Sequence, residues 1–193
     1  DDDGGTLLCA SISDLTAQFH ATLWTQPRPI LITSGTLAIG KDFSRFKKEA
    51  GLTRNPRTEE SVSPSPYDYR KNCLLYVPAM PPRHHDADYF DKLASEIRDL
   101  LIAAHGHALV LFTSYAAMSS VKERLKYHPL PFSLFTMGRN APHTMAQFKA
   151  TPGSVLLATG AAWEGFDFPG DCVSLLVIPR LPFQYPDALQ EKK

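Results

Sequence analysis

The 193-residue sequence predicts an α/β fold of three layers, in which helices cover both faces of a mainly parallel sheet. Short apolar runs alternate along the chain with segments whose apolar residues recur at helical spacing, which is the element order of a parallel sheet. The runs are apolar at successive positions, so both faces of each strand are expected to be buried. The length and the 44% hydrophobic content agree with a sizeable core.

The first half of the chain is predicted to hold short elements separated by a long connection. The expected elements are a helix over residues 13–25, a strand over 30–33, a short helix over 43–50 and a strand over 74–77. The first helix follows a capping pair, Ser13-Asp14, and the second is expected to end at Gly51. Residues 53–70 contain three prolines among many polar residues, which predicts an irregular connection.

The second half is predicted to be more regular. Its expected elements are a helix over residues 86–104, a strand over 108–112, a helix over 115–127, a weak strand at 134–135, a short helix at 145–148 and strands over 155–158 and 173–178. Leu93, Ile97 and Leu101 recur on one side of the first of these helices, as expected for a helix that covers a sheet.

Charge and cysteine content exclude several classes of protein. Lys plus Arg and Asp plus Glu number 20 each, so a nucleic-acid partner would have to be held by local clusters or backbone amides rather than by bulk charge. The cysteines, Cys9, Cys73 and Cys172, are too far apart for a zinc or iron–sulfur spacing, and they indicate reduced thiols in a cytoplasmic protein. No apolar run approaches the roughly 20 residues that cross a bilayer, so no membrane partner is expected. The acidic start, residues 1–5, is typical of a loop cut from a longer chain.

Residues 35–41 have the glycine spacing of a phosphate-binding P-loop, with Gly35, four further residues and then Gly40-Lys41. A P-loop next needs a Ser or Thr hydroxyl for Mg²⁺, whereas this chain has Asp42, whose charge has the same sign as that of a phosphate. None of the other apolar runs ends in the acidic residue that completes such a site. A strand, a turn and the start of a helix is the favoured interpretation, and a stand-alone nucleotide-binding enzyme is kept as a rival.

Small hydroxyl residues, glycines and a pair of acids follow the predicted strands. They lie at residues 33–36, 113–115, 159–167 and 179–180. The carboxyl ends of parallel strands share one edge of a sheet, where such folds bind their ligands. Each group also has a plain structural interpretation. Ser114 can cap the following helix, and Glu164 and Asp167 can form a turn. Trp163 and Phe166 can belong to the core.

Taken together, these segments resemble the motifs of superfamily 2 helicases of the XPD/DinG type, in family order. Residues 31–37 (LITSGTL) resemble motif III, 110–115 (VLFTSY) motif IV, 158–171 motif V in its bacterial DinG form, and 177–183 (VIPRLPF) the segment after motif V. The resemblance covers residues 28–187 and implies a RecA-like, P-loop NTPase-like fold. Residues 1–40 would then be the end of a first motor domain with a linker, and 41–193 a second RecA-like domain truncated before motif VI.

The resemblance also implies a function, that of an ATP-dependent DNA helicase or translocase acting in processes such as DNA repair. ATP with Mg²⁺ would lie in a cleft shared with the first RecA-like domain of the same chain, and single-stranded DNA would cross both domains. The implied ATP-binding and coupling residues are Thr33, Ser34, Gly35, Thr36, Glu164, Gly165 and Asp167, and the implied DNA-binding residues are Thr113, Ser114, Tyr115 and Arg180. The resemblance places no catalytic residue or metal ligand within the chain, which alone is expected to be inactive, and a family iron–sulfur cluster would lie upstream.

Elementary chemistry agrees with several of these roles. Gly165 lets backbone approach a nucleotide without a Cβ in the way, and Asp167 can accept from a ribose hydroxyl or hold an arginine. Ser114 and Tyr115, at a helix N-terminus, can donate to a phosphate. Arg180 is a candidate phosphate contact, with a structural salt bridge as the alternative. Two other functions stay open: a RecA-like binding or scaffolding module without ATP turnover, and an ATP-driven single-strand nuclease.

Overall fold

The structure is a computed structural model that describes residues 12, 14–79, 86–138 and 141–183. The chain divides into two compact units, of which one extends to Tyr76 and the other is Val77–Pro186. Each unit is described below by itself. The division concerns packing, and the boundary predicted at residue 40 between two motor domains stays a prediction.

The unit Val77–Pro186 contains a four-stranded sheet in which every strand pair is parallel. Its elements in chain order are α4 (Tyr89–Ala103), β1 (Ala108–Phe112), α5 (Tyr115–Lys126), β2 (Leu134–Thr136), α6 (Ala141–Ala150), β3 (Val155–Thr159), the 3₁₀ turns η2 (Gly160–Trp163) and η3 (Gly170–Cys172), and β4 (Leu175–Val177). The strand order across the sheet is β2-β3-β1-β4, so β1 lies between β3 and β4.

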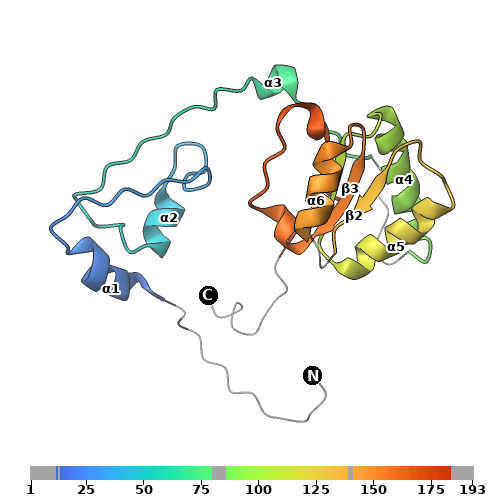
Figure 1. The fold of residues 1–193 in the computed structure, drawn as a ribbon. Helices are drawn as coiled ribbons and strands as arrows, with labels where there is room; N and C mark the ends of the chain where they lie inside the picture. Colours follow the sequence, from blue (N-terminus) through green and yellow to red (C-terminus); the bar gives the residue numbers. More distant parts are fainter. Residues whose placement is uncertain (1–11, 13, 80–85, 139–140, 184–193) are drawn as a thin grey trace, which may run out of the picture. The chain divides into compact units, whose positions relative to one another are not determined.

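Helices cover both faces of this sheet and make three layers. Alternate residues of β1 face opposite sides: Val110 packs with α4 and α5, whereas Leu111 packs with α6. Both central strands, β1 and β3, are buried at all five positions. In Figure 1, α6 crosses one face of the sheet and α4 and α5 lie on the other. The predicted α/β fold with a covered, mainly parallel sheet is therefore confirmed.

Local chemistry accounts for where the helices begin and end. The predicted helix over residues 86–104 is α4, which begins three residues later than expected, at Tyr89. After α4, His105 is left-handed with a φ of +54°, and the N–H groups of His105 and Gly106 donate to the carbonyl oxygens of Ile102 and Leu101, which ends the helix. A Cβ built on Gly106 would lie 1.9 Å from the carbonyl oxygen of Gly153, so the loops that precede β1 and β3 touch there through backbone alone.

The unit that extends to Tyr76 holds short helical segments. They are α1 (Thr16–Phe19), the π-helical turn η1 (His20–Trp24), α2 (Ser44–Glu49) and α3 (Tyr69–Asn72). The Trp24 Nε1–H donates to the Ala50 carbonyl oxygen at 2.7 Å and joins η1 to the end of α2. Gly51, with a φ of +70°, ends α2 as predicted. The helix expected over residues 13–25 forms from Thr16 onward, while Ser13 lies outside the described residues.

Two predicted strands do not form. Residues 30–33 and 74–77 have no regular secondary structure and no strand partner among the described residues, and Leu31 and Leu74 are 91% and 93% exposed. A strand needs a neighbouring strand for its N–H and C=O groups, and apolar residues alone do not supply one. The strand prediction was therefore wrong at both places.

Two further expectations concern thiols and membranes. Cys73 is exposed and Cys172 is half-buried, and both are free thiols; Cys9 lies outside the described residues. Among the described helices, none combines the length and apolar character required to cross a bilayer.

Candidate functional site

The candidate site is one edge of the sheet, where three loops leave three neighbouring strands. β1 and β3 end level with each other, because Phe112 is paired with Thr159, the last residue of each strand. Residues 113–115 follow β1, η2 and residues 164–167 follow β3, and Arg180 follows β4 shortly after its end. The structure thus brings together the predicted site residues of this unit at one edge, as the sequence predicts.

Ser114 is the N-cap of α5. Its Oγ accepts a hydrogen bond from the Ala117 N–H at 3.2 Å, so the plain structural interpretation of this serine is confirmed. Capping uses the oxygen as an acceptor and leaves the hydroxyl hydrogen able to donate outward. Thr113, Ser114 and Tyr115 are all exposed, so these donors face solvent at the start of a 12-residue helix.

Arg180 lies beside this helix start. Together with Thr113 and Ser114 it lines a small cavity of about 40 Å³, whose walls include Phe90 and Phe112. The cavity has room for a few water molecules and not for a nucleobase. Arg180 itself is exposed, and no ion pair joins it to another described residue, so the salt-bridge alternative has no described partner.

The loop after β3 is fastened on both sides of its polar residues. Before them, the Trp163 Nε1–H donates to the Phe112 carbonyl oxygen at 3.0 Å, and the half-buried indole packs against the α6 side of the core. After them, Phe168 stacks edge-on against Phe148 with ring centroids 5.9 Å apart, and the Lys149 ammonium lies 5.4 Å from the Phe168 centroid. Sequence reasoning allowed Trp163 a place in the core and missed its hydrogen bond, for which no sequence signal exists.

Between these anchors, the loop presents an open stretch of backbone and two carboxylates. Glu164 and Asp167 are exposed, and Phe166 is partly so. Gly165 has a φ of +81° and nothing lies within 4 Å of the position where a Cβ would be. Backbone that is open in this way can be approached closely by a phosphate, and an exposed carboxylate can accept a hydrogen bond from a hydroxyl group.

The remaining predicted residues, Thr33 to Thr36, belong to the other unit. Ser34 and Thr36 form a local turn in which the Thr36 N–H donates to the Ser34 Oγ at 3.2 Å, and all four residues are exposed. Their role in nucleotide coupling stays a prediction.

The following segment behaves as the start of a helix. Asp42 accepts hydrogen bonds from the Ser44 hydroxyl at 2.5 Å and from the Ser44 N–H at 2.8 Å, and the two bonds lower the pKa of this carboxyl group. Asp42 therefore fixes the beginning of α2. A P-loop follows a strand, and the described residues before position 35 contain none.

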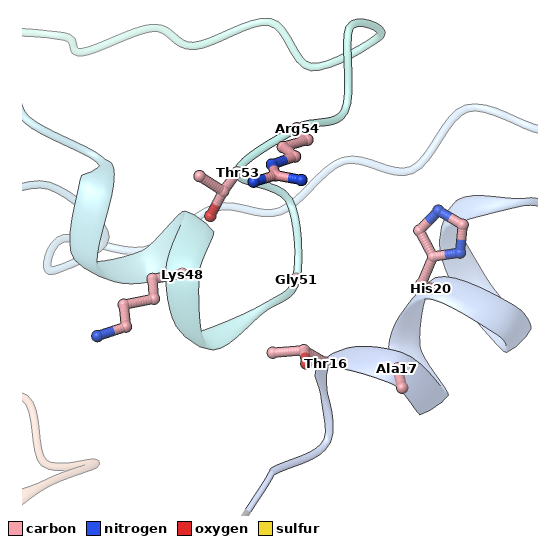
Figure 2. Close-up of a pocket in the computed structure, with 7 residues that line it drawn as sticks. All are labelled: Thr16, Ala17, His20, Lys48, Gly51, Thr53 and Arg54. Atoms are coloured by element: carbon pink, nitrogen blue, oxygen red, sulfur yellow. The ribbon is translucent and has the colours of Figure 1, made fainter. Parts of the chain in front are cut away.

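A second hollow lies on the surface of that same unit. It measures about 360 Å³ and is lined by Thr16, Ala17, His20, Lys48, Gly51, Thr53 and Arg54. In Figure 2 the Lys48 amine points away from the His20 ring, so the basic side chains do not converge on one point. None of the predicted site residues lines this hollow. Within the described part of the chain, no group of three or more His, Cys, Asp or Glu side chains is placed to hold a metal ion.

Residues 97–193, half of the chain, match the family of helicase C-terminal domains. The chain belongs to this family. All three loops of the sheet edge lie inside the matched range, whereas Thr33 to Thr36 lie outside it. The resemblance to helicases stated from the motifs is thereby confirmed.

Relatives of this helicase C-terminal domain carry related names. The chain is 32% identical over 173 residues to the ATP-dependent DNA helicase YoaA of Haemophilus influenzae. This alignment covers 88% of the chain and 26% of the relative. The chain is 33% identical over 159 residues to the ATP-dependent helicase DinG of Mycobacterium tuberculosis, covering 81% of this chain and 24% of the relative. A 3'-5' exonuclease DinG of Bacillus subtilis is 30% identical over 82% of this chain and 18% of the relative. The chain thus spans about a quarter or less of the length of these relatives.

Proposed function

We propose that this helicase C-terminal domain is the second RecA-like motor domain of an ATP-dependent DNA helicase or translocase. It would supply one side of the ATP cleft and part of the single-stranded DNA path. The observation that carries the proposal is the meeting of three motif-bearing loops at one edge of a parallel sheet, within the matched family range. The names of the relatives, ATP-dependent helicases, support the same activity.

The nucleotide side of the site is the loop after β3. Gly165 and Asp167 would face ATP with its Mg²⁺, and the bound group would supply the phosphoryl-transfer chemistry. Within the chain, Asp167 would accept from a ribose hydroxyl or hold an arginine, and Glu164 would link the loop to the DNA side. Thr33 to Thr36 would sense whether the cleft toward the first RecA-like domain is closed.

The DNA side of the site is the start of α5 with its neighbour Arg180. Hydroxyl and amide donors at a helix N-terminus bind phosphates through charge and geometry rather than through base identity. Thr113, Ser114 and Tyr115 offer such donors, and Arg180 adds a cation beside them. These contacts explain how a chain with a formal net charge of zero can hold a strand of any sequence.

Movement along DNA would follow from contacts that both domains make with the bound ATP. ATP stabilises the closed arrangement when it contacts both domains, and its hydrolysis removes that preference. Each domain would then change its grip on the strand in turn, which moves the motor along single-stranded DNA.

The proposal is tested by Asp167→Ala in the full-length protein. We expect ATP hydrolysis stimulated by single-stranded DNA to be lost, because the variant removes an acceptor from the nucleotide loop. Folding should be unchanged, since Asp167 is exposed and does not belong to either cluster of the hydrophobic core. ATPase rates with and without DNA, together with a circular dichroism melt, provide the measurement.

Asp171→Ala is the matched control for this variant. Asp171 is an exposed aspartate at the end of the same loop, and its described contact, with His107, uses its backbone carbonyl oxygen rather than its carboxylate. The control should keep wild-type stimulation. An Asp167→Ala protein with wild-type stimulation would contradict the proposed role.

A second function has one observation in its favour, the exonuclease name of the Bacillus subtilis relative. In that case this domain would drive a nuclease along a single strand. Incubation of the full-length protein with end-labelled single-stranded DNA and ATP separates the two functions, because only a nuclease shortens the strand. A binding or scaffolding module without turnover would show neither ATP hydrolysis nor shortening of the strand.

A further inference from the structure

One hydrogen bond joins the two halves of the sheet-edge site. The indole Nε1–H of Trp163 donates to the carbonyl oxygen of Phe112 at 3.0 Å, across 51 residues of sequence. Trp163 is the last residue of η2, and Phe112 is the last residue of β1. The bond therefore spans from the loop after β3 to the end of the neighbouring strand.

The positions of the two partners give this bond its significance. Glu164 and Gly165, on the nucleotide side, directly follow Trp163 along the chain. Thr113 and Ser114, on the DNA side, directly follow Phe112. An N–H···O contact is lost beyond about 3.5 Å, so Trp163 Nε1 and the Phe112 carbonyl oxygen can separate by only about 0.5 Å more with the bond intact.

The indole is held from the other side as well. Its ring packs against the core between the sheet and α6, and Phe112 is 1% exposed. The core holds the indole ring and the end of β1 holds its N–H, so a displacement of Trp163 must either break the bond or move the Phe112 carbonyl group, which is bonded directly to the Thr113 nitrogen.

We propose that Trp163 is a positioning residue that couples the nucleotide loop to the DNA-binding loop through this bond. The inference rests on the proposed function. It adds to that function the residue through which ATP binding and DNA binding affect each other within this domain. When nucleotide moves Glu164 and Gly165, the indole carries the movement to the start of α5. When DNA fixes the start of α5, the indole holds the nucleotide loop in place.

A purely structural role makes a different prediction. If Trp163 only fills space in the core, its replacement lowers every activity of the protein by the same factor. A coupling role instead changes the ratio between the ATPase rate with single-stranded DNA and the rate without it. This ratio decides between the two roles, because an overall loss of folded protein cancels from it.

The test is Trp163→Phe in the full-length protein. Phenylalanine keeps an aromatic ring in the core and removes the N–H donor. We expect the stimulation ratio to fall at least about fivefold, the lower end of typical coupling factors between two sites. The change in single-stranded DNA affinity caused by a non-hydrolysable ATP analogue should fall as well, since coupling between binding sites is reciprocal.

Trp24→Phe provides the matched control. The Trp24 Nε1–H also donates to a backbone carbonyl oxygen, that of Ala50, at 2.7 Å, and it joins two helical segments of the other unit. This variant removes the same kind of bond and should keep the wild-type ratio. A wild-type ratio in Trp163→Phe, or an equal fall in Trp24→Phe, would overturn the coupling role.

An isosteric replacement covers the case in which Trp163→Phe does not fold. A 3-benzothienyl-alanine at position 163 keeps the bicyclic shape and exchanges the N–H for a sulfur without a hydrogen. The ratio should fall as for phenylalanine, and an unchanged ratio would reject the inference. A wild-type protein whose ATPase does not respond to DNA would contradict the proposed function itself, and the coupling with it.

Discussion

The two units of the chain use similar apolar runs with opposite results. In the unit Val77–Pro186, the runs at 108–112 and 155–159 are buried strands between two layers of helices. In the other unit, Ile30, Leu31 and Ile32 are all exposed, and buried apolar side chains among its described residues are limited to Ala50 and Leu52. The difference teaches that an apolar run becomes a strand only when the fold provides neighbouring strands and a covering layer.

The largest effect on stability is expected where the loops that precede β1 and β3 touch, since the buried strands of this unit start from that contact. Gly106→Ala would place a Cβ 1.9 Å from the Gly153 carbonyl oxygen, at a residue with a φ of +79°. We expect a loss of more than about 4 kcal/mol of unfolding free energy, since backbone on both sides must move. Chemical denaturation followed by far-ultraviolet circular dichroism measures the loss.

Gly138→Ala is the control for this glycine. A Cβ there meets nothing within 4 Å, and its φ lies outside the left-handed region, so the change should stay within about 0.5 kcal/mol. Equal stability of the two variants would show that the loops before β1 and β3 are not held together as the structure has them.

A second test compares one leucine from each unit. Leu157, in β3, is fully buried, whereas Leu74 is 93% exposed. Leu157→Ala should lower the free energy of unfolding by about 2–5 kcal/mol through lost burial and the cavity left behind. Leu74→Ala should change it by less than about 0.5 kcal/mol. Urea titration of the two variants gives both numbers, and a large loss for Leu74 would mean that its run is buried after all.

The smallest effect is expected from the charge that begins α2. Two hydrogen bonds lower the pKa of Asp42 below its ordinary value of 3.8. The bond from the Ser44 hydroxyl has the larger effect, and the bond from the Ser44 N–H has the smaller one. A carboxyl group with a depressed pKa in the folded state stabilises the fold above its unfolded pKa, and this stabilisation is lost as the pH falls through the folded pKa.

Asp42→Asn tests this acid dependence. Melting curves of wild type and variant should differ at pH 5 and converge as the pH falls below the ordinary carboxyl pKa of 3.8, because asparagine carries no titrating charge. A constant difference across this range would show that the charge of Asp42 contributes nothing to the start of α2.

Local patterns in the sequence predicted most of the regular unit. Helical spacing located α4 and α5, a serine after a strand located the cap of α5, and the family motifs located the loops of the sheet edge. Errors fell on the strands at 30–33 and 74–77, since strand formation depends on partners far away in the sequence. Thr33 to Thr36 were predicted to follow one of these strands, so the strand end on which that placement depended does not form.

The sequence by itself determined the order of helices and strands in the second unit and which polar residues follow each strand. These properties come from interactions between residues a few positions apart, such as capping and amphipathic spacing. Only the tertiary structure decided that β1 lies between β3 and β4, so that the Glu164 and Arg180 loops flank the start of α5. It also decided that the Trp163 indole reaches the Phe112 carbonyl oxygen. The physical reason is that strand order and contacts such as this one depend on packing between segments far apart in the sequence. Hydrophobic burial stabilises that packing but is non-directional, so no local sequence pattern specifies it.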